Sequence, residues 1–541
     1  MKIALAQLNY HIGNFPQNVG KIIDSIHWAK ERSADLVIYA ELAICGYPPR
    51  DFLEFESFVQ SCNDGLLQIA KECQGIAAIV GCPVSNRSGK GKALYNAACF
   101  LNNGQVEFIQ RKTLLPTYDI FDEYRYFEPN SEHRTVQYKG KRIAITICED
   151  LWNIGENKLY EREPMQELIK SNPDVVINIS ASPFSADHYK ERSDMLIANA
   201  EKYQIPFLYV NHVGAQTELI FDGKSMVCLP GKGVVKTLCA FDEDRQIIDL
   251  EEDLEVEETN YTWENDVLSA LTLGVKDYFR KSGFNKAVIG LSGGIDSALT
   301  VAIACKALGP INVNTLLMPS PYSSDHSIDD SIELCKRLGC SYKVIRIDRH
   351  IEDFDHSLNE LFGDLPKDLT EENIQARVRS ILLMAVSNKF GSILLNTSNK
   401  SEKAVGYGTL YGDLSGGLSV LGDVYKTQVY KLASYVNRKK DIIPNHILLK
   451  EPSAELRHDQ RDTDSLPDYD ELDPILYQYI EERKSADEIV TLGHDAQVVK
   501  RVLNLVNSSE YKRFQTAPIL RVSKKAFGMG RRMPIVGKYL Y

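Results

Sequence analysis

The sequence predicts an α/β protein of at least two domains, the second of them a doubly wound parallel sheet. Short apolar strands alternate with helical segments along both halves of the chain. Between the halves, residues 242–258 are dense in carboxylates and poor in apolar side chains. In the second half, the apolar run 287–289 leads into a glycine-rich turn and then a helical segment. Such a turn is typical of a ligand-binding strand end in an open parallel sheet.

Composition excludes several classes of protein. A chain of 541 residues is too long for one core. No apolar run approaches the ~18–20 residues needed to cross a bilayer. The net charge of −12 argues against a nucleic-acid partner, although local amides, lysines and a metal ion can still bind an anionic nucleotide. The 11 cysteines contain no Cys-x-x-Cys pair and the N-terminus is unlike a signal peptide, so a cytoplasmic protein with reduced thiols is expected.

The elements follow in order along the chain. In a first domain, 1–241, strands are predicted at 3–8, 36–39, 77–80, 106–110, 142–147, 175–179 and 207–210. The acidic residues 242–264 are predicted to be a linker. In a second domain, 265–541, an amphipathic helix and then strands are predicted at 265–280, 286–290, 314–318, 342–347 and 392–396.

The glycine-rich turn is the most informative segment. It consists of Gly290, Leu291, Ser292, Gly293, Gly294, Ile295, Asp296 and Ser297. Glycines let backbone N–H groups close around phosphate oxygens, and the following helix adds a partial positive charge. Asp296 can hold magnesium against the same phosphates. The turn lacks the lysine of a Walker loop and resembles the Ser-Gly-Gly-x-Asp-Ser loop of ATP pyrophosphatases, which cleave ATP between its α and β phosphates.

Further segments extend this resemblance over residues 265–541. They lie at 318–324, 370–379, 396–402, 411–413 and 423–427. In this order they resemble NAD synthetases, which use ATP to amidate nicotinic acid adenine dinucleotide (deamido-NAD). The resemblance implies a Rossmann-like fold of the ATP pyrophosphatase type.

The resemblance also implies binding residues. Residues 290–297, Thr397 and Lys426 would bind ATP, and Asp296 and Glu402 would bind magnesium. Deamido-NAD would contact Asn373, Arg377, Glu402 and Lys512. Leu410 stands where ammonia-dependent relatives carry a lysine before Tyr-Gly-Asp, so that role is not transferred.

In the first domain, three strand ends carry a charged or thiol side chain: Glu41, Lys112 and Cys148. The set resembles the Glu-Lys-Cys triad of nitrilase-superfamily amidases, over roughly residues 1–240, and implies an α-β-β-α sandwich. Cys148 would attack the glutamine side chain, form a thioester and expel ammonia. Glu41 would move the protons, and Lys112 would stabilise the thiolate and the oxyanion.

The same resemblance implies glutamine contacts. Tyr118, six residues after Lys112, and Ser182 match substrate residues of the family. Lys190 matches the lysine that follows, with two extra residues in between. His212 stands where glutamine is common and is predicted to be a hydrogen-bonded wall residue. The loop residue Cys45 lacks the setting of Cys148.

Together the halves predict a glutamine-using synthetase in which ammonia passes through an enclosed route, because escape to water would protonate it. A homo-oligomer with paired synthetase domains is expected. Asparagine-synthetase-like chains need a cysteine where Lys2 stands, so this class is set aside. GMP-synthetase-like chains need a Gly-x-Cys-x-Gly elbow, which the sequence lacks. Two alternatives remain open. One is a synthetase that uses free ammonia, with the first domain as scaffold, and the other is a nucleotide-sensing module fused to an amidase.

Overall fold

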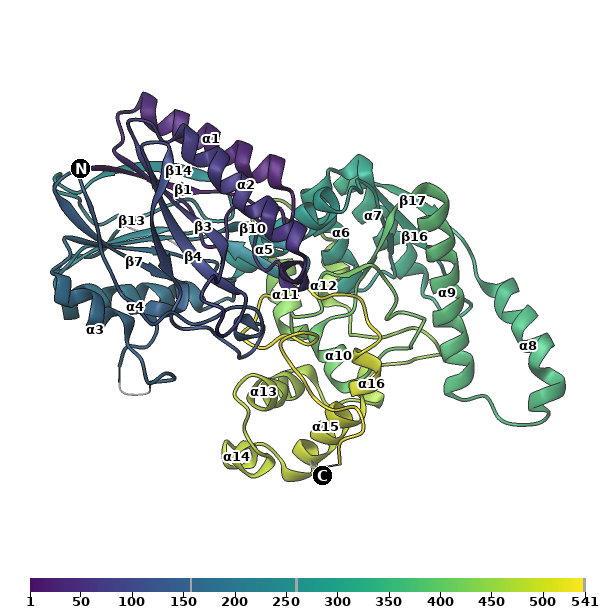
Figure 1. Cartoon of the computed structure of the whole chain (residues 1–541). Coiled ribbons are helices and arrows are strands. Elements are labelled where there is room, and N and C mark those ends of the chain that lie inside the picture. Colours follow the sequence, from purple (N-terminus) through teal and green to yellow (C-terminus); the bar gives the residue numbers. More distant parts are fainter. Residues whose placement is uncertain (156–157, 258–260, 539–541) are drawn as a thin grey trace. The chain divides into compact units, whose positions relative to one another are not determined.

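The computed structural model describes residues 1–155, 158–257 and 261–538 (Figure 1). The chain forms two compact units, Met1–Tyr261 and Thr262–Tyr541. Within the described residues, no helix is long and apolar enough to cross a membrane.

The first unit contains two six-stranded sheets and one short hairpin. In spatial order, the first sheet consists of β14 (Asp244–Asp249), β1 (Lys2–Gln7), β2 (Leu36–Ile38), β3 (Ala77–Ser85), β4 (Leu94–Asn102) and β5 (Gln105–Arg111). The second consists of β13 (Gly233–Thr237), β12 (Met226–Leu229), β9 (Phe207–Val210), β8 (Val175–Ile179), β7 (Lys141–Ile147) and β6 (Val136–Tyr138). The hairpin is β10 (Val213–Gln216) with β11 (Leu219–Asp222).

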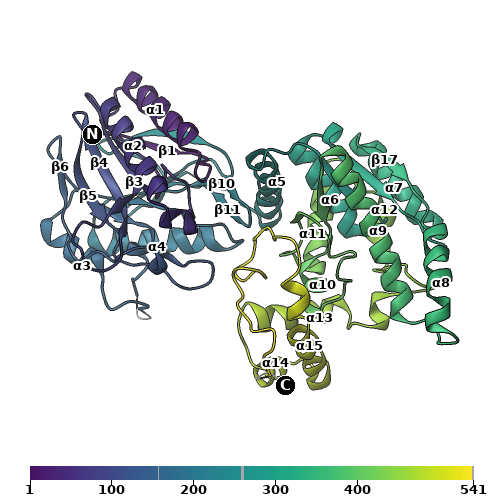
Figure 2. The same cartoon turned by 45° about the vertical axis from the view of Figure 1, so that its right-hand side comes forward.

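Alternation of side chains along the strands builds four layers. Ile3 of β1 packs between the sheets with Ile145 and Ile177 of the second sheet. The next residue, Ala4, packs on the other face. The helices that cover the outer faces are α1 (Phe15–Glu31) and α2 (Glu56–Glu72) on the first sheet, and α3 (Pro164–Leu168) and α4 (His188–Tyr203) on the second (Figure 2). This arrangement confirms the predicted α-β-β-α sandwich.

The second unit is built on one parallel sheet. Its spatial order is β17 (Ser341–Val344), β16 (Val313–Leu317), β15 (Ala287–Gly290), β18 (Ile393–Asn396) and β19 (Leu418–Ser419), with all neighbours parallel. The order reverses between β15 and β18, which is the ligand-binding point of a doubly wound sheet. The predicted fold class of this half is therefore confirmed.

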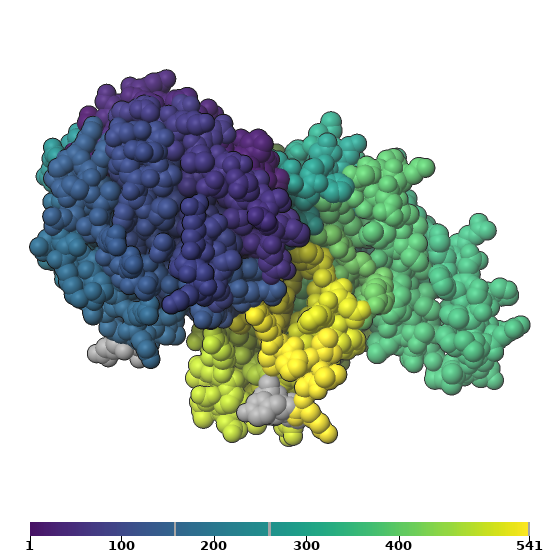
Figure 3. All heavy atoms as spheres, viewed as in Figure 1, coloured from purple at the N-terminus to yellow at the C-terminus, as the bar shows by residue number. Residues whose placement is uncertain are grey.

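The helices of the second unit complete it. They are α5 (Trp263–Lys281), α6 (Ile295–Leu308), α7 (Asp325–Leu338), α8 (Asp348–Phe362), α9 (Leu369–Phe390), α10 (Lys400–Val405), α11 (Lys426–Asn437), α12 (Asn445–Leu449), α13 (Tyr469–Ile480), α14 (Ala486–Thr491), α15 (Ala496–Ser508) and α16 (Glu510–Arg513). Helices α13 to α15 share a separate apolar core with α10. Helix α8 buries none of its residues and projects from the rest of this unit (Figure 3).

The acidic stretch 242–264 is not a linker along its whole length. Residues Asp244–Asp249 form β14, which pairs antiparallel with β1 and buries Ile248. Ile247 packs with the helix layer on one face of this sheet, and Ile248 packs between the two sheets. The carboxylates of this segment lie on β14, which is an edge strand. Residues 258–260 lie outside the described part of the chain.

Candidate active sites

Cys148 begins a short 3₁₀ helix directly after β7. Its backbone lies in the left-handed region, with φ of +43°, a strained conformation for a residue with a side chain. The side chain is buried, and burial followed by the nearby Glu41 raises the pKa of the thiol well above its usual value, against the effect of Lys112. The resting group is therefore a thiol, and its nucleophilic form requires a base.

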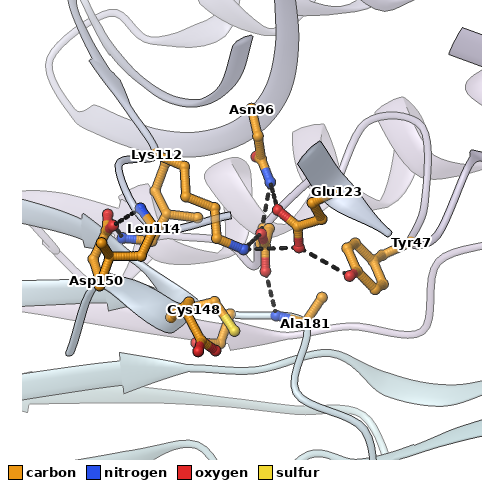
Figure 4. Close-up of polar contacts among 12 residues, drawn as sticks. Tyr47, Asn96, Lys112, Leu114, Glu123, Cys148, Asp150 and Ala181 are labelled. Atoms are coloured by element: carbon orange, nitrogen blue, oxygen red, sulfur yellow. Dashed lines mark hydrogen bonds and ion pairs between the residues drawn. The ribbon is translucent and has the colours of Figure 1, made fainter. Parts of the chain in front are cut away.

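Lys112 lies near Cys148 (Figure 4), and the charges of Glu41 and Lys112 both act on this thiol. The Lys112 Nζ lies 2.6 Å from Glu41 Oε1, and both side chains are fully buried. The Ala181 N–H donates to Glu41 Oε2 at 2.9 Å, and the Asn96 amide donates to Oε1 at 2.6 Å. These donors fix the carboxylate on the loop after β2, so the structure brings together the three residues predicted as the triad.

A second glutamate, Glu123, joins the pair and was not predicted. Its Oε1 lies 2.8 Å from Lys112 Nζ and accepts from the Tyr47 hydroxyl at 2.9 Å. Burial lowers the pKa of Lys112, but Glu123 and Glu41 outweigh it and raise that pKa well above its usual value. Lys112 is thus a permanent cation. Glu123 lies in a short 3₁₀ helix away from any strand end, so no periodic signal marks it.

Asp150 ties the strand end of Cys148 to the strand end of Lys112. Its Oδ1 accepts from the backbone N–H groups of Thr113 and Leu114 at 3.0 and 2.9 Å, and its Oδ2 accepts from Ile147 N–H at 3.1 Å. Burial raises the pKa of Asp150 to about 7, and the three N–H donors act in the opposite direction. The side chain therefore fixes the residues next to Lys112 and next to Cys148 relative to each other.

The predicted substrate residues divide into two groups. Tyr118 donates its hydroxyl to Glu149 at 2.9 Å, and the Tyr160 hydroxyl donates to the same carboxylate at 3.1 Å. Ser182 Oγ lies 2.9 Å from His188 Nε2. Glu149 follows Cys148 directly, so the Tyr118 and Tyr160 contacts lie next to Cys148.

Lys190 does not join this cluster. Its side chain is 79% exposed and pairs with Asp194 one turn along α4. His188, two residues earlier, reaches Ser182 instead. The two extra residues before Lys190 are the signal in the sequence that points to His188, because they leave His188 at the spacing usual for the lysine.

His212 and Cys45, the two other residues weighed in the sequence, are buried and make contacts that suit a structural role. His212 is buried, donates through Nε2 to the Glu41 carbonyl at 2.6 Å and packs edge-on against Tyr10. Cys45 is buried, its thiol donates to the Leu42 carbonyl at 3.7 Å, and burial followed by Cys62 raises its pKa.

In the second unit, a cavity of about 650 Å³ lies beyond the carboxyl ends of β15 and β18. The predicted ligand residues that line it are Gly290, Leu291, Ser292, Gly294, Ile295, Asp296, Ser297, Asn373, Thr397, Glu402, Lys426 and Lys512. Gly293 is not a lining residue. Its φ is +82°, and a Cβ there would lie 2.6 Å from the carbonyl oxygen of Ser327, so only glycine lets the loop approach α7 this closely.

The carboxylates of Asp296 and Glu402 both lie close to the Lys426 ammonium. The Lys426 ammonium contacts Asp296 Oδ2 and lies 3.6 Å from Glu402 Oε1, and Asn399 donates to Asp296 Oδ1 at 2.9 Å. Burial and the neighbouring Asp296 raise the pKa of Glu402 to about 8, against Lys426. Two carboxylates that converge on a cation are suited to magnesium, which prefers oxygen ligands.

Three of the residues predicted to contact deamido-NAD form hydrogen bonds with the segment 406–410, namely Asn373, Arg377 and Lys512. Thr409 donates to Asn373 Oδ1 at 2.6 Å, and Lys512 Nζ donates to the carbonyls of Gly406 and Gly408, each at 2.8 Å. Arg377 Nε donates to the Leu410 carbonyl at 3.2 Å, but the Arg377 side chain is exposed and does not line the cavity.

Sequence reasoning gave no role to several charged residues that line the cavity, among them Arg379, Lys450 and Asp462. Arg379 lies within the predicted motif 370–379, which is the signal that marks it. Its Nε donates to the Met318 carbonyl at 3.0 Å, and burial lowers the pKa of Arg379 to about 10. Lys450 is the C-cap of α12 and Asp462 begins a short 3₁₀ helix, and neither belongs to a predicted motif. They reach the cavity only through the tertiary fold.

The fold and the two sites define a two-part enzyme, an amidase-type unit joined to a nucleotide-binding synthetase unit. Residues 2–255 match the carbon-nitrogen hydrolase family, and residues 267–516 match the NAD synthase family. The chain is 45% identical to the glutamine-dependent NAD(+) synthetase of Synechocystis sp., over 98% of both chains. It is 38% identical to that of Thermotoga maritima, over 100% of this chain and 99% of the relative.

A solved structure gives the same result. The glutamine-dependent NAD+ synthetase from Acinetobacter baumannii, in complex with adenosine diphosphate, aligns with a TM-score of 0.79 at 38% identity and covers 99% of this chain and 98% of that one. The chain belongs to the glutamine-dependent NAD(+) synthetase family.

Proposed function

We propose that the chain amidates deamido-NAD to NAD with ATP, and that glutamine hydrolysis in the first unit supplies the ammonia. The observation that carries this proposal is the presence of two chemically different groups of side chains, one in each unit. One is the Glu41–Lys112–Cys148 cluster, and the other is the cavity that contains the glycine-rich loop with Asp296 and Glu402. We propose that the predicted domain 1–241, together with β14, acts as the glutaminase and that residues 265–541 act as the synthetase.

In the first unit, Glu41 removes the thiol proton, and the sulfur of Cys148 attacks the amide carbon of glutamine. Lys112 stabilises the oxyanion, and Glu41 passes the proton to the departing nitrogen, so ammonia leaves and a thioester remains. Glu41 then activates water, which releases glutamate and the thiol. Glu149, held by Tyr118 and Tyr160, offers a negative group to the substrate ammonium.

In the second unit, the carboxylate of deamido-NAD attacks the α-phosphorus of ATP and releases pyrophosphate. Ammonia then attacks the carbonyl carbon and displaces AMP. Residues 290–297, Thr397 and Lys426 are suited to bind ATP, while Asn373, Arg377, Glu402 and Lys512 are suited to bind deamido-NAD. Asp296 and Glu402 would hold Mg²⁺, which would supply positive charge against the phosphate oxygens.

Because ammonia in water is mostly ammonium at neutral pH, we propose an enclosed route between the sites. We also propose a homo-oligomer with paired synthetase units. The support for the oligomer is the exposed apolar side chains of α8, α9 and the segment between them, here called the α8–α9 surface, namely Phe354, Leu361, Leu365, Leu369, Ile381, Met384 and Phe390.

A paired assay with two nitrogen donors tests the function. Cys148→Ala is expected to abolish NAD formation from glutamine and to leave NAD formation from ammonium salts unchanged, with AMP and pyrophosphate measured together. Equal loss with both donors would contradict the division of roles. NAD formation by the unmodified chain from ammonium salts but not from glutamine would favour the scaffold alternative, and absence of AMP and pyrophosphate from the unmodified chain would favour the sensor.

A further inference from the structure

His188, the first residue of α4, is held by three neighbours. Its Nε2 lies 2.9 Å from Ser182 Oγ, and its Nδ1 lies 2.9 Å from Glu191 Oε2. The ring stacks on Trp152 with centroids 5.3 Å apart and planes 2° apart. Trp152 follows Cys148 by four residues. The imidazole is therefore fixed beside a serine that is proposed to bind glutamine.

The hydrogen-bond partners define the state of the neutral ring. A carboxylate accepts only, so Nδ1 carries a hydrogen and donates to Glu191, which leaves Nε2 to accept from the Ser182 hydroxyl. Protonation at Nε2 reverses this bond. Nε2–H then donates to Ser182 Oγ, and the hydroxyl hydrogen becomes available to another acceptor.

A free amino acid brings two charged groups to this site. Glu149 offers a negative group for the α-ammonium, and the α-carboxylate requires a positive one. Lys112 is committed to Glu41 and Glu123, and Lys190 is turned to solvent with Asp194. Arg192 is buried in an ion pair with Asp222. Of the cation-forming side chains described around Ser182, His188 is the one whose side chain contacts the Ser182 hydroxyl.

We propose that protonated His188 supplies the positive charge and orients the Ser182 hydroxyl to bind the α-carboxylate of glutamine, so that glutamine binding takes up a proton. This inference rests on the proposed glutaminase function of the first unit. It makes His188 a specificity-determining residue where a permanently charged lysine was predicted.

The surroundings of His188 determine the sign of the pH effect. Burial, the largest effect, and Arg192 lower its pKa. Glu191 on the same helix and Asp222 from β11 raise it, but the net pKa lies below the usual value. The lowered pKa favours the neutral ring in the free protein. A bound carboxylate favours the cation, so the KM for glutamine is expected to rise with pH, by up to about tenfold per unit.

Glutamine-driven NAD synthesis by the full chain, with saturating ATP and deamido-NAD, tests this between pH 6 and 8.5. His188→Gln is expected to raise the KM for glutamine at least about tenfold at pH 6.5 and to remove its dependence on pH, with little change in kcat. His188→Lys is expected to restore a low KM that is independent of pH. Ammonium-driven synthesis serves as the control and should be the same in all three proteins at each pH.

Other outcomes would overturn the inference. They are a His188→Gln variant whose KM follows pH as in the unmodified chain, or a loss confined to kcat. Failure of the unmodified chain to use glutamine at any pH would instead overturn the proposed function.

Discussion

At the scale of single residues, Asp150 determines how well the first site is assembled, although it is not placed among the reacting groups. Its three backbone partners lie next to Lys112 and next to Cys148. In an Asp150→Asn variant the side chain keeps one acceptor oxygen, but its NH₂ group replaces the other. That NH₂ group faces a backbone N–H donor, which is then left without an acceptor. A buried donor that loses its acceptor costs about 1–3 kcal/mol.

Asp150→Asn is therefore expected to lower kcat for glutamine-driven synthesis about tenfold to a hundredfold and to leave ammonium-driven synthesis unchanged. The measurement is NAD formation with each donor. Asp174→Asn is the matched control, because Asp174 accepts from the Arg142 N–H at 2.6 Å at the opposite end of β7. A similar loss in both variants would show that the effect is on the strand rather than on the site.

The residues of the first site differ in how far sequence predicts them. Glu41, Lys112 and Cys148 could be predicted because each follows a strand-like segment and the set resembles the Glu-Lys-Cys triad of the nitrilase superfamily. Glu123 could not, because it reaches Lys112 from a short 3₁₀ helix. Lys190 was predicted from residue type, but helix geometry turns it to solvent and places His188 at Ser182.

At the scale of elements, β3 approaches the loop that carries Glu41 more closely than any side chain allows. A Cβ on Gly81 would lie 2.3 Å from the Leu42 nitrogen and 2.4 Å from the Ala40 carbonyl oxygen. These are backbone atoms on both sides of Glu41, so a methyl group there must displace the Glu41 carboxylate.

Gly81→Ala is therefore expected to lose at least about 1–3 kcal/mol of stability and most glutamine-driven activity. Thermal unfolding and the two-donor assay measure these effects. Gly20→Ala in α1 is the matched control, because a Cβ there meets nothing within 4 Å, and alanine is expected to stabilise the helix by about 0.5–1 kcal/mol. Full glutamine-driven activity in Gly81→Ala would contradict the steric argument.

Elements were predicted where periodicity alone defines them. The strands at 36–39, 142–147 and 175–179 appear as β2, β7 and β8 within a few residues. Strand β14 was missed because its carboxylates resemble a linker, and pairing with β1, more than 200 residues away, makes it a strand. Strand β4 was missed because its small apolar residues fit a helix as well as a strand.

At the scale of the whole molecule, α9 has two faces with different surroundings. Ala376, Arg379 and Leu383 line the nucleotide cavity. Arg377 and Ile381 lie four residues apart and are exposed, Ile381 by 61%. A residue proposed to bind deamido-NAD therefore shares an exposed stripe with a large apolar side chain. A second copy of the chain that covers this stripe would bury the isoleucine and enclose the arginine beside the cavity.

Ile381→Lys is accordingly expected to convert the oligomer to smaller species, because a buried ammonium without a partner opposes association. Sedimentation velocity at several protein concentrations measures this change. Ile311→Lys is the matched control, since Ile311 is 88% exposed on a short 3₁₀ helix after α6 and is not one of the residues of the α8–α9 surface. If Ile381→Lys sediments as the unmodified chain does, the α8–α9 surface is not where the copies meet.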